Sequence, residues 1–308
     1  MAKRTKNFAA DRDFTEEMLP NNRKTQFFMI IRNRIPLLFK ASIVTFVFFI
    51  PILIAMSFRV SVNNSFYRRF QTGDISYEVF QNYILYTDFW SVLIYVPCLA
   101  VASLGLSGLN RLTHQLVFGE GIIFKDDFFL GIKNNWKQYL LYTFFLSMAF
   151  VFGRWVRLYF QDTIFSFVLF FVICAVAVPY YLVLLLYSNV YTSRGGELLK
   201  NVFMATLSGK LKLLFYIAVV VVPVIFLEFL TGGYLFLILF ALYLLALPIL
   251  ALLGNMLYAG IFDELFNYLN NVEIVKKGLY IDEKEKEMIK STHTGLLKQL
   301  QQKGDRFN

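Results

Sequence analysis

Cysteine, histidine and charged side chains are all scarce in this chain of 308 residues. It has two cysteines, Cys98 and Cys174, and two histidines, His114 and His293. So few thiols cannot build a disulfide scaffold, and with two imidazoles they make a poor ligand set for a metal centre. Charged residues make up 17% of the chain, against about 25% in ordinary soluble domains. This composition excludes a disordered chain and is untypical of a soluble protein.

The chain also lacks the short motifs that mark common catalytic sites. It has no G-x-S-x-G nucleophile turn, no H-E-x-x-H zinc motif and no phosphate-binding P-loop. We therefore expect no catalytic residue, no cofactor and no metal ion, and we expect that the protein is not an enzyme. The polar start of the chain has no apolar core and does not resemble a secretory signal peptide.

Apolar residues, by contrast, make up 57% of the chain and come in long blocks that include many of its 35 phenylalanines. A helix needs about 20 mostly apolar residues to span a bilayer. Six segments qualify: 41–58, 89–109, 139–160, 163–187, 211–230 and 233–253. Blocks of this kind do not fit the alternating strands of a membrane barrel, and otherwise only helices satisfy their backbone in lipid. The sequence predicts an all-α polytopic membrane protein with six transmembrane helices.

The positive charges predict how these helices are oriented. Of the 30 lysines and arginines, only five lie in segments that would face away from the cytoplasm: Arg59, Arg68, Arg69, Arg154 and Arg157. Cytoplasmic loops carry the excess of lysine and arginine, so we expect both termini in the cytoplasm and the protein in the cell (inner) membrane. The net charge of +9 suits an anionic membrane surface, and its spread over loops beside the spans argues against nucleic-acid binding.

Three parts of the chain are expected from this pattern. Residues 1–26 form a polar, basic cytoplasmic N-terminus. Residues 27–262 form the transmembrane domain, with an extracytoplasmic insertion at 59–88. Residues 263–308 form a cytoplasmic C-terminal tail with helical character, which either docks a partner or is simply solvated.

An internal repeat is also predicted. The pattern F-F-x-x-I-[K/R]-N occurs at 27–33 and 128–134, each time just before a predicted span, and a weaker copy precedes the fifth span. These matches favour a pseudo-threefold repeat of helical hairpins. Each hairpin would begin with an amphipathic segment that lies either in the headgroup plane or as a buried elbow. The alternative is a chance similarity between phenylalanine-rich segments.

The segment 109–142 combines a span end, a Gly-Glu turn, a phenylalanine pair and a lysine- and asparagine-rich run into the next span. The residues that form these features are Gly119, Glu120, Phe128, Phe129, Lys133, Asn134, Lys137 and Gln138. With this pattern the segment resembles the YesL family, a group of bacterial membrane proteins defined as a domain of unknown function. The resemblance implies an association with carbohydrate uptake systems and offers no catalytic residues. The chain departs from the family in its long N-terminus, the 59–88 insertion and the charged tail.

Two polar groups are candidate sites. Asn110, Arg111 and His114 end the second predicted span at neighbouring helical positions. They form either a small site for an anionic headgroup or substrate or, as we favour, a snorkelling arginine beside a solvated histidine. Four charged residues are expected near the outer ends of the spans: Asp88, Arg154, Arg157 and Glu228. They form either an ion-paired cluster or separate headgroup contacts.

The favoured function is a non-enzymatic protein that assists or regulates a transport system, with carbohydrate uptake implied by the resemblance. Its expected partners are membrane lipids and a transporter complex, and the oligomeric state is not indicated. The alternative is a transporter, channel or lipid-handling protein with a pathway between the helical hairpins. A polar lumen lined by Ser103, Ser107, Asn110, Arg111 and His114 would favour the alternative, whereas a dry centre would favour the accessory role.

Overall fold

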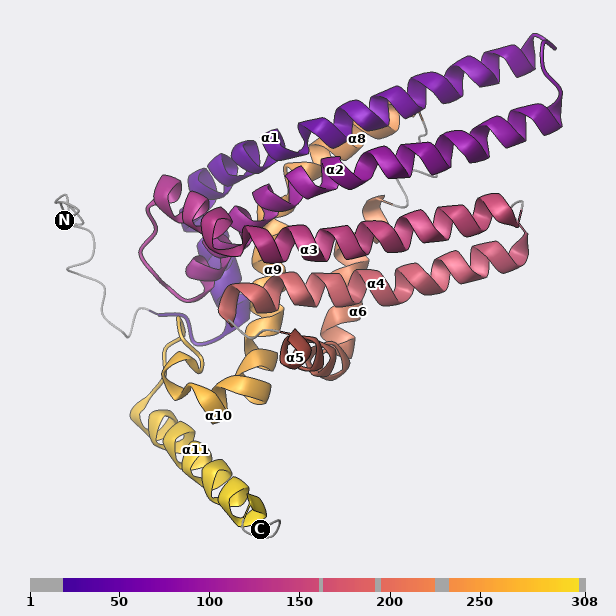
Figure 1. The fold of residues 1–308 in the computed structure, drawn as a ribbon. Coiled ribbons are helices and arrows are strands. Elements are labelled where there is room, and N and C mark those ends of the chain that lie inside the picture. Colours follow the sequence, from indigo (N-terminus) through magenta and orange to yellow (C-terminus); the bar gives the residue numbers. More distant parts are fainter. Residues whose placement is uncertain (1–18, 161–162, 192–194, 225–232, 305–308) are drawn as a thin grey trace.

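Two antiparallel helical hairpins lie side by side in the computed structural model, which describes residues 19–160, 163–191, 195–224 and 233–304 (Figure 1). Regular structure in these ranges is entirely helical. The elements of the first hairpin are α1 (Arg23–Gln71) and α2 (Tyr77–Val117), and those of the second are α3 (Phe124–Tyr159) and α4 (Ile164–Val190). Helix α2 packs against both α1 and α3. We call the end where α1 begins the basic end and the end where both hairpins turn the hairpin end.

The described residues also form α5 (Gly195–Ser208), α6 (Lys210–Val220), α8 (Gly233–Leu244) and α9 (Leu247–Phe262). Helix α9 contacts α1 and α2, and α8 contacts α1. A π-helical turn (Asp263–Asn267), a short α10 (Tyr268–Asn270), a 3₁₀ turn (Val272–Ile274) and α11 (Glu283–Gly304) follow. Helix α11 projects from the basic end in Figure 1.

The helices have the length and composition of membrane spans. Five apolar runs, including the continuous stretch Leu247–Asn270, are long enough to cross a bilayer, and α5 with α6 adds a sixth if the pair is counted as one span bent by 88°. Large apolar side chains face outward, among them Ile164 at 84% exposed and Phe171 at 73%. Such extensive apolar surface requires a non-aqueous solvent. The protein is therefore a membrane-embedded helical bundle, and the count of exactly six spans stays a prediction.

The segment 59–88 is not a separate unit but an extension of the first hairpin. Helices α1 and α2 continue unbroken to the turn at 72–76, where the Ser76 side chain accepts from the Val79 amide and so caps α2. Aromatic rings hold the two extensions together: Phe66 stacks on Tyr83 with centroids 4.3 Å apart, and Phe70 stacks on Phe80 at 5.1 Å. Pairs of this geometry stabilise beyond the area they bury.

The predicted sixth span, 233–253, is broken between α8 and α9. Pro248 stands at the start of α9, where its missing N–H does no harm. The break leaves the Leu245 carbonyl without a partner in its own helix, and the buried Ser42 hydroxyl of α1 donates to it at 2.7 Å. A carbonyl freed at membrane depth needs such a partner because no water is available there.

Candidate functional site

Tyr139 is the centre of a hydrogen-bond network that joins α2, α3 and α4. Its fully buried hydroxyl donates to the Leu185 carbonyl at 2.9 Å. The same oxygen accepts from Asn110 Nδ2 at 3.1 Å and from Asn189 Nδ2 at 2.7 Å. Asn135 Nδ2 then donates to Asn189 Oδ1 at 3.0 Å. One donor and two acceptor positions are all that a hydroxyl has, so Tyr139 is saturated and Asn110 serves helix pairing.

The sequence groups Arg111 and His114 with Asn110 in one candidate site, but in the structure they contact different neighbours. The Arg111 side chain covers Gly131 of α3, where an added Cβ would stand 2.8 Å from Arg111 Cβ. The His114 ring lies 4.2 Å from the ring of Phe118, and its Nε2 is buried without a hydrogen-bond partner among the described residues. Asn110 therefore bonds to Tyr139, Arg111 covers Gly131, and the His114 ring contacts Phe118 at the end of its own helix, so the three side chains do not share one ligand site.

The contact between α2 and α3 is close and directly hydrogen-bonded. The buried Ser107 hydroxyl donates to the Gly131 carbonyl at 2.8 Å. A Cβ on Gly108 would stand 2.8 Å from the Phe128 carbonyl oxygen, so the two backbones almost touch. On the other side of α2, Asn255 Nδ2 of α9 donates to Thr113 Oγ1 at 3.0 Å. Small residues at helix contacts and polar side chains that bond across helices are typical of packing in membranes.

An ion-pair cluster lies between α1, α2 and α3 toward the hairpin end. Asp88 contacts Arg59 at 2.6 Å through Oδ1 and Arg154 at 3.2 Å through Oδ2, and its side chain is 12% exposed. Sequence reasoning included Asp88 and Arg154 but left out Arg59. Arg157 lies over the Phe167 ring, 4.4 Å from its centroid. Glu228, the fourth predicted member, lies outside the described residues.

At the basic end, three distant parts of the chain meet in what we call the basic-end junction (residues 20–26, 117–120 and 276–280). Gln26 Nε2 donates to the carbonyls of Val117 at 2.8 Å and Gly278 at 3.0 Å. Arg23 donates to the same Val117 carbonyl at 3.1 Å. The Tyr280 amide donates to the Pro20 carbonyl at 3.1 Å. These bonds tie the start of α1, the end of α2 and the chain before α11 into one surface.

Ion pairs and a buried carboxylate extend the junction. Lys277 Nζ pairs with Glu120 at 2.8 Å, and Lys276 pairs with Glu285 of α11. Buried Asp263, in the π-helical turn, accepts from the Lys276 amide at 3.1 Å and from Asn267 Nδ2 at 2.7 Å. π-Helical turns are frequent at functional sites, and this one anchors the C-terminal segment.

Tyr191 connects the end of α4 to this segment. Its hydroxyl donates to Asn267 Oδ1 at 2.6 Å. Burial, and then the nearby Asp263 carboxylate, raise the pKa of Tyr191 well above its usual range. The hydroxyl therefore stays protonated and remains a donor at any physiological pH.

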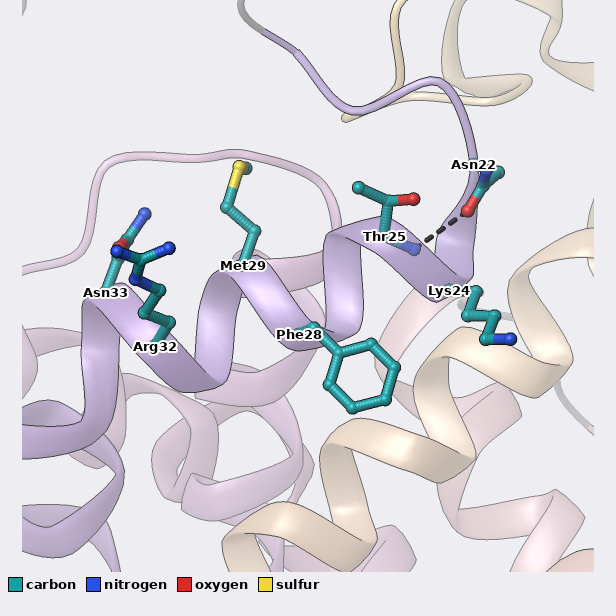
Figure 2. Close-up of a pocket in the computed structure, with 7 residues that line it drawn as sticks. All are labelled: Asn22, Lys24, Thr25, Phe28, Met29, Arg32 and Asn33. Atoms are coloured by element: carbon teal, nitrogen blue, oxygen red, sulfur yellow. Dashed lines mark hydrogen bonds between the residues drawn. The ribbon is translucent and has the colours of Figure 1, made fainter.

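A groove of about 660 Å³ follows the exposed face of α1 at the basic end, and we call it the α1 groove. Its lining residues are Asn22, Lys24, Thr25, Phe28, Met29, Arg32 and Asn33. Figure 2 shows Met29, Arg32 and Asn33 on one side of the helix and Phe28 with Lys24 toward another, while Asn22 caps the Thr25 amide. Phe28 is 61% exposed, and Lys24 and Arg32 stand one helical turn before and after it in the sequence. The surface therefore combines positive charge with exposed apolar area.

The family-like residues lie on both sides of the α2–α3 connection. Gly119 has a φ of +67° at the end of α2, a backbone conformation that favours glycine. Phe128 is fully buried, whereas Phe129 is half exposed. Lys133 and Asn134 are exposed, Lys137 Nζ lies 5.5 Å from the Trp136 ring, and Gln138 lines an apolar groove between α3, α4 and α5.

In the two strongest copies of the repeat pattern, the paired phenylalanines face the same way relative to the core. Phe27 packs inward against the core and Phe28 faces outward, as Phe128 and Phe129 do. The third segment differs, because α5 meets α6 at an 88° bend. Gly209 at this bend lets α9 approach, since a Cβ there would stand 2.7 Å from Ile261 Cδ1. The threefold repeat stays a prediction.

Fold and composition define the class: a polytopic α-helical membrane protein whose polar groups gather at its two ends and at the crossing of α2 with α3 and α4. Among the described residues, no cluster of three or more histidine, cysteine, aspartate or glutamate side chains could hold a metal ion. No family model, no curated protein and no solved structure matches the chain. The resemblance to YesL therefore stays a prediction.

Proposed function

We propose that the protein is a non-enzymatic accessory or regulatory component of a transport system in a cell membrane, with both chain termini in the cytoplasm. The observation that carries this proposal is the basic-end junction, where three distant parts of the chain form one hydrogen-bonded surface beside the α1 groove. Such a surface is suited to a protein partner. The resemblance of 109–142 to YesL-like proteins adds carbohydrate uptake as the expected transport class.

The packed centre of the bundle weighs against a substrate pathway between the hairpins. Ser107 and Asn110 would have lined such a pathway, but they hydrogen-bond to Gly131 and Tyr139 of α3 instead. A conducting or transporting lumen would need these groups to be free for solvent or substrate. Their pairing favours a protein that works through its surface.

The α1 groove suggests the chemistry of the partner segment. Lys24 and Arg32 would attract acidic side chains, while Phe28 offers an apolar contact between them. An amphipathic segment with acidic residues, carried by a transporter subunit, would satisfy both features.

Affinity purification in mild detergent tests the proposal. We expect a transporter subunit to follow the wild-type chain and to be lost when Lys24→Glu is combined with Arg32→Glu. The matched control combines Arg68→Glu with Arg69→Glu at the hairpin end, which reverses as much charge far from the groove. If the protein purifies alone in every condition, or if the groove variant retains the subunit, the proposal is wrong.

A further inference from the structure

A stretch of the N-terminus has a charge opposite to that of the α1 groove. Residues 1–18 lie outside the described residues, and their sequence separates the two signs of charge. The first half is basic, with Lys3, Arg4 and Lys6. The second half has one basic residue, Arg12, among four acidic ones: Asp11, Asp13, Glu16 and Glu17. We call residues 11–18 the acidic segment.

The α1 groove has the complementary pattern around one phenylalanine. Lys24 and Arg32 stand one helical turn before and after Phe28, and all three side chains are exposed. Neither cation has an ion-pair partner among the described residues, and α1 contains no acidic residue along its whole length. In the acidic segment, Phe14 has two carboxylates on each side in the sequence. The two stretches therefore complement each other in charge, and each offers an aromatic ring.

The path of the chain into α1 brings the acidic segment close to the groove. The backbone bends at Leu19, Asn21 and Asn22, and the Pro20 carbonyl accepts from the Tyr280 amide at 3.1 Å. This bond fixes the point from which the acidic segment extends, next to the end of the groove at Asn22.

The acidic segment is also long enough to reach along the groove. Phe28 lies six residues beyond Asn22, which is about 9 Å along the helix. The eight residues from Phe14 to Asn22 span up to about 26 Å, so a reversed chain can bring the two rings together. Lys24 and Arg32 are about 12 Å apart along the axis, and an extended acidic segment covers that distance. A short tether keeps the effective concentration near millimolar, so a weak interaction is sufficient.

We propose that the acidic segment docks in the α1 groove of its own chain and competes there with the partner. The chain reverses at 19–22, so Glu17 lies against Lys24. Asp11, farther from the reversal, lies against Arg32, and the two phenylalanine rings meet between these ion pairs. The competition rests on the proposed function, because it needs a partner for the same groove, whereas the docking itself does not.

Photo-crosslinking within single molecules tests the docking. The full chain carries p-benzoylphenylalanine in place of Phe28 and is reconstituted at one molecule per nanodisc in phosphatidylcholine. One molecule per disc excludes cross-links between two copies. We expect cross-links to residues 11–18, located by fragment-ion mass spectrometry.

Phe129 provides a matched position for the probe. It is 51% exposed and has Lys125 and Lys133 at the same spacing as the cations of the α1 groove. The exposed carboxylate of Asp126 stands on the preceding turn and repels an acidic segment. We expect no cross-link to residues 11–18 from this position, and an equal yield from the two positions overturns the docking.

Neutral variants of the chain with the probe at position 28 test the ion pairs. Two exposed ion pairs change a binding equilibrium by roughly 2- to 30-fold, and the cross-link yield should fall by that factor when the four acids are neutralised. The changes are Asp11→Asn, Asp13→Asn, Glu16→Gln and Glu17→Gln. The matched control, in which Lys3, Arg4 and Lys6 are changed to glutamine, should not lower the yield. A yield that does not fall after acid neutralisation overturns the docking.

The affinity purification described above tests the competition separately. The acid-neutralised chain should recover severalfold more transporter subunit than the wild type, and equal recovery shows that the competition is wrong. If the cross-link forms but no subunit follows any variant, the docking stands and the proposed function fails. If a subunit follows the wild type but no cross-link forms, the docking fails and the proposed function stands.

Discussion

Replacing Gly278 with alanine should open the basic-end junction without unfolding the bundle. Gly278 has a φ of +83°, and its carbonyl accepts from Gln26 Nε2. A Cβ added there would overlap the Val117 carbonyl oxygen and stand 3.0 Å from Gln26 Nε2. A backbone oxygen cannot rotate away as a side chain can, so the segment around Gly278 must move and the Gln26 bonds must lengthen.

Gly73 provides a matched control for this change. Its φ of +78° is almost the same, but a Cβ there meets nothing within 4 Å. Each alanine carries the cost of a left-handed backbone, about 1–2 kcal/mol. Gly278→Ala adds the cost of overpacking, about 1–3 kcal/mol. This extra cost of Gly278→Ala over Gly73→Ala corresponds to roughly a 5- to 150-fold change in the equilibrium constant for opening the junction.

Hydrogen exchange followed by mass spectrometry measures this opening in the purified full chain. The Tyr280 amide donates to the Pro20 carbonyl, so it reports whether the junction is closed. We expect Gly278→Ala to speed exchange of 276–282 at least fivefold, while Gly73→Ala leaves it unchanged and both variants retain the protection of α2 and α3. Equal exchange of 276–282 in the two variants would refute the close contact between Gly278 and Val117.

Two further predictions concern the interior polar groups, and both are read from thermal unfolding in detergent. Tyr139→Phe removes the acceptor of the buried Asn110 amide, which costs about 1–3 kcal/mol when unpaired, and one of the two acceptors of the Asn189 amide, so it should lower the melting temperature. Tyr67→Phe, at a residue that is 49% exposed, should not. Asp88→Asn weakens two arginine contacts of a mostly buried carboxylate and should destabilise by about 1–3 kcal/mol, whereas Asp126→Asn on the surface should have little effect. Equal shifts within either pair would contradict these assignments.

The first four apolar helices could be predicted from sequence because each contains a long apolar block. In lipid, a single block of this kind satisfies its backbone hydrogen bonds only as a helix. The continuation of α1 and α2 through 59–88 could not be predicted, because polar residues are equally compatible with a loop. A signal was nevertheless present. Phe66 and Phe70 are one helical turn apart, as are Tyr77 and Phe80, which is the spacing of a helix face.

The candidate polar sites show a different limit of sequence reasoning. Hydropathy places Asn110 near the end of its span but cannot say which helix it faces. Its partner Tyr139 comes from another helix, 29 positions away, and Asn189 donates to the same hydroxyl from a third helix, 50 positions beyond Tyr139. Both bonds depend on the register between helices. Arg59 was missed for the same reason: only the α1–α2 pairing brings it to Asp88.

The register of α2, α3 and α4 against one another explains how a lipid-embedded bundle can hold a fixed surface at its basic end. Apolar side chains do not drive helices together in lipid, so close backbone contact and hydrogen bonds must do so. The Gly108 contact and the Ser107–Gly131 bond fix α2 against α3, and the Tyr139 network fixes α3 against α4. A shift of α3 by one residue would move the Ser107 acceptor by about 1.5 Å and lose the bond. The position of the α2–α3 connection, and with it the Glu120–Lys277 pair of the junction, is therefore set inside the bundle.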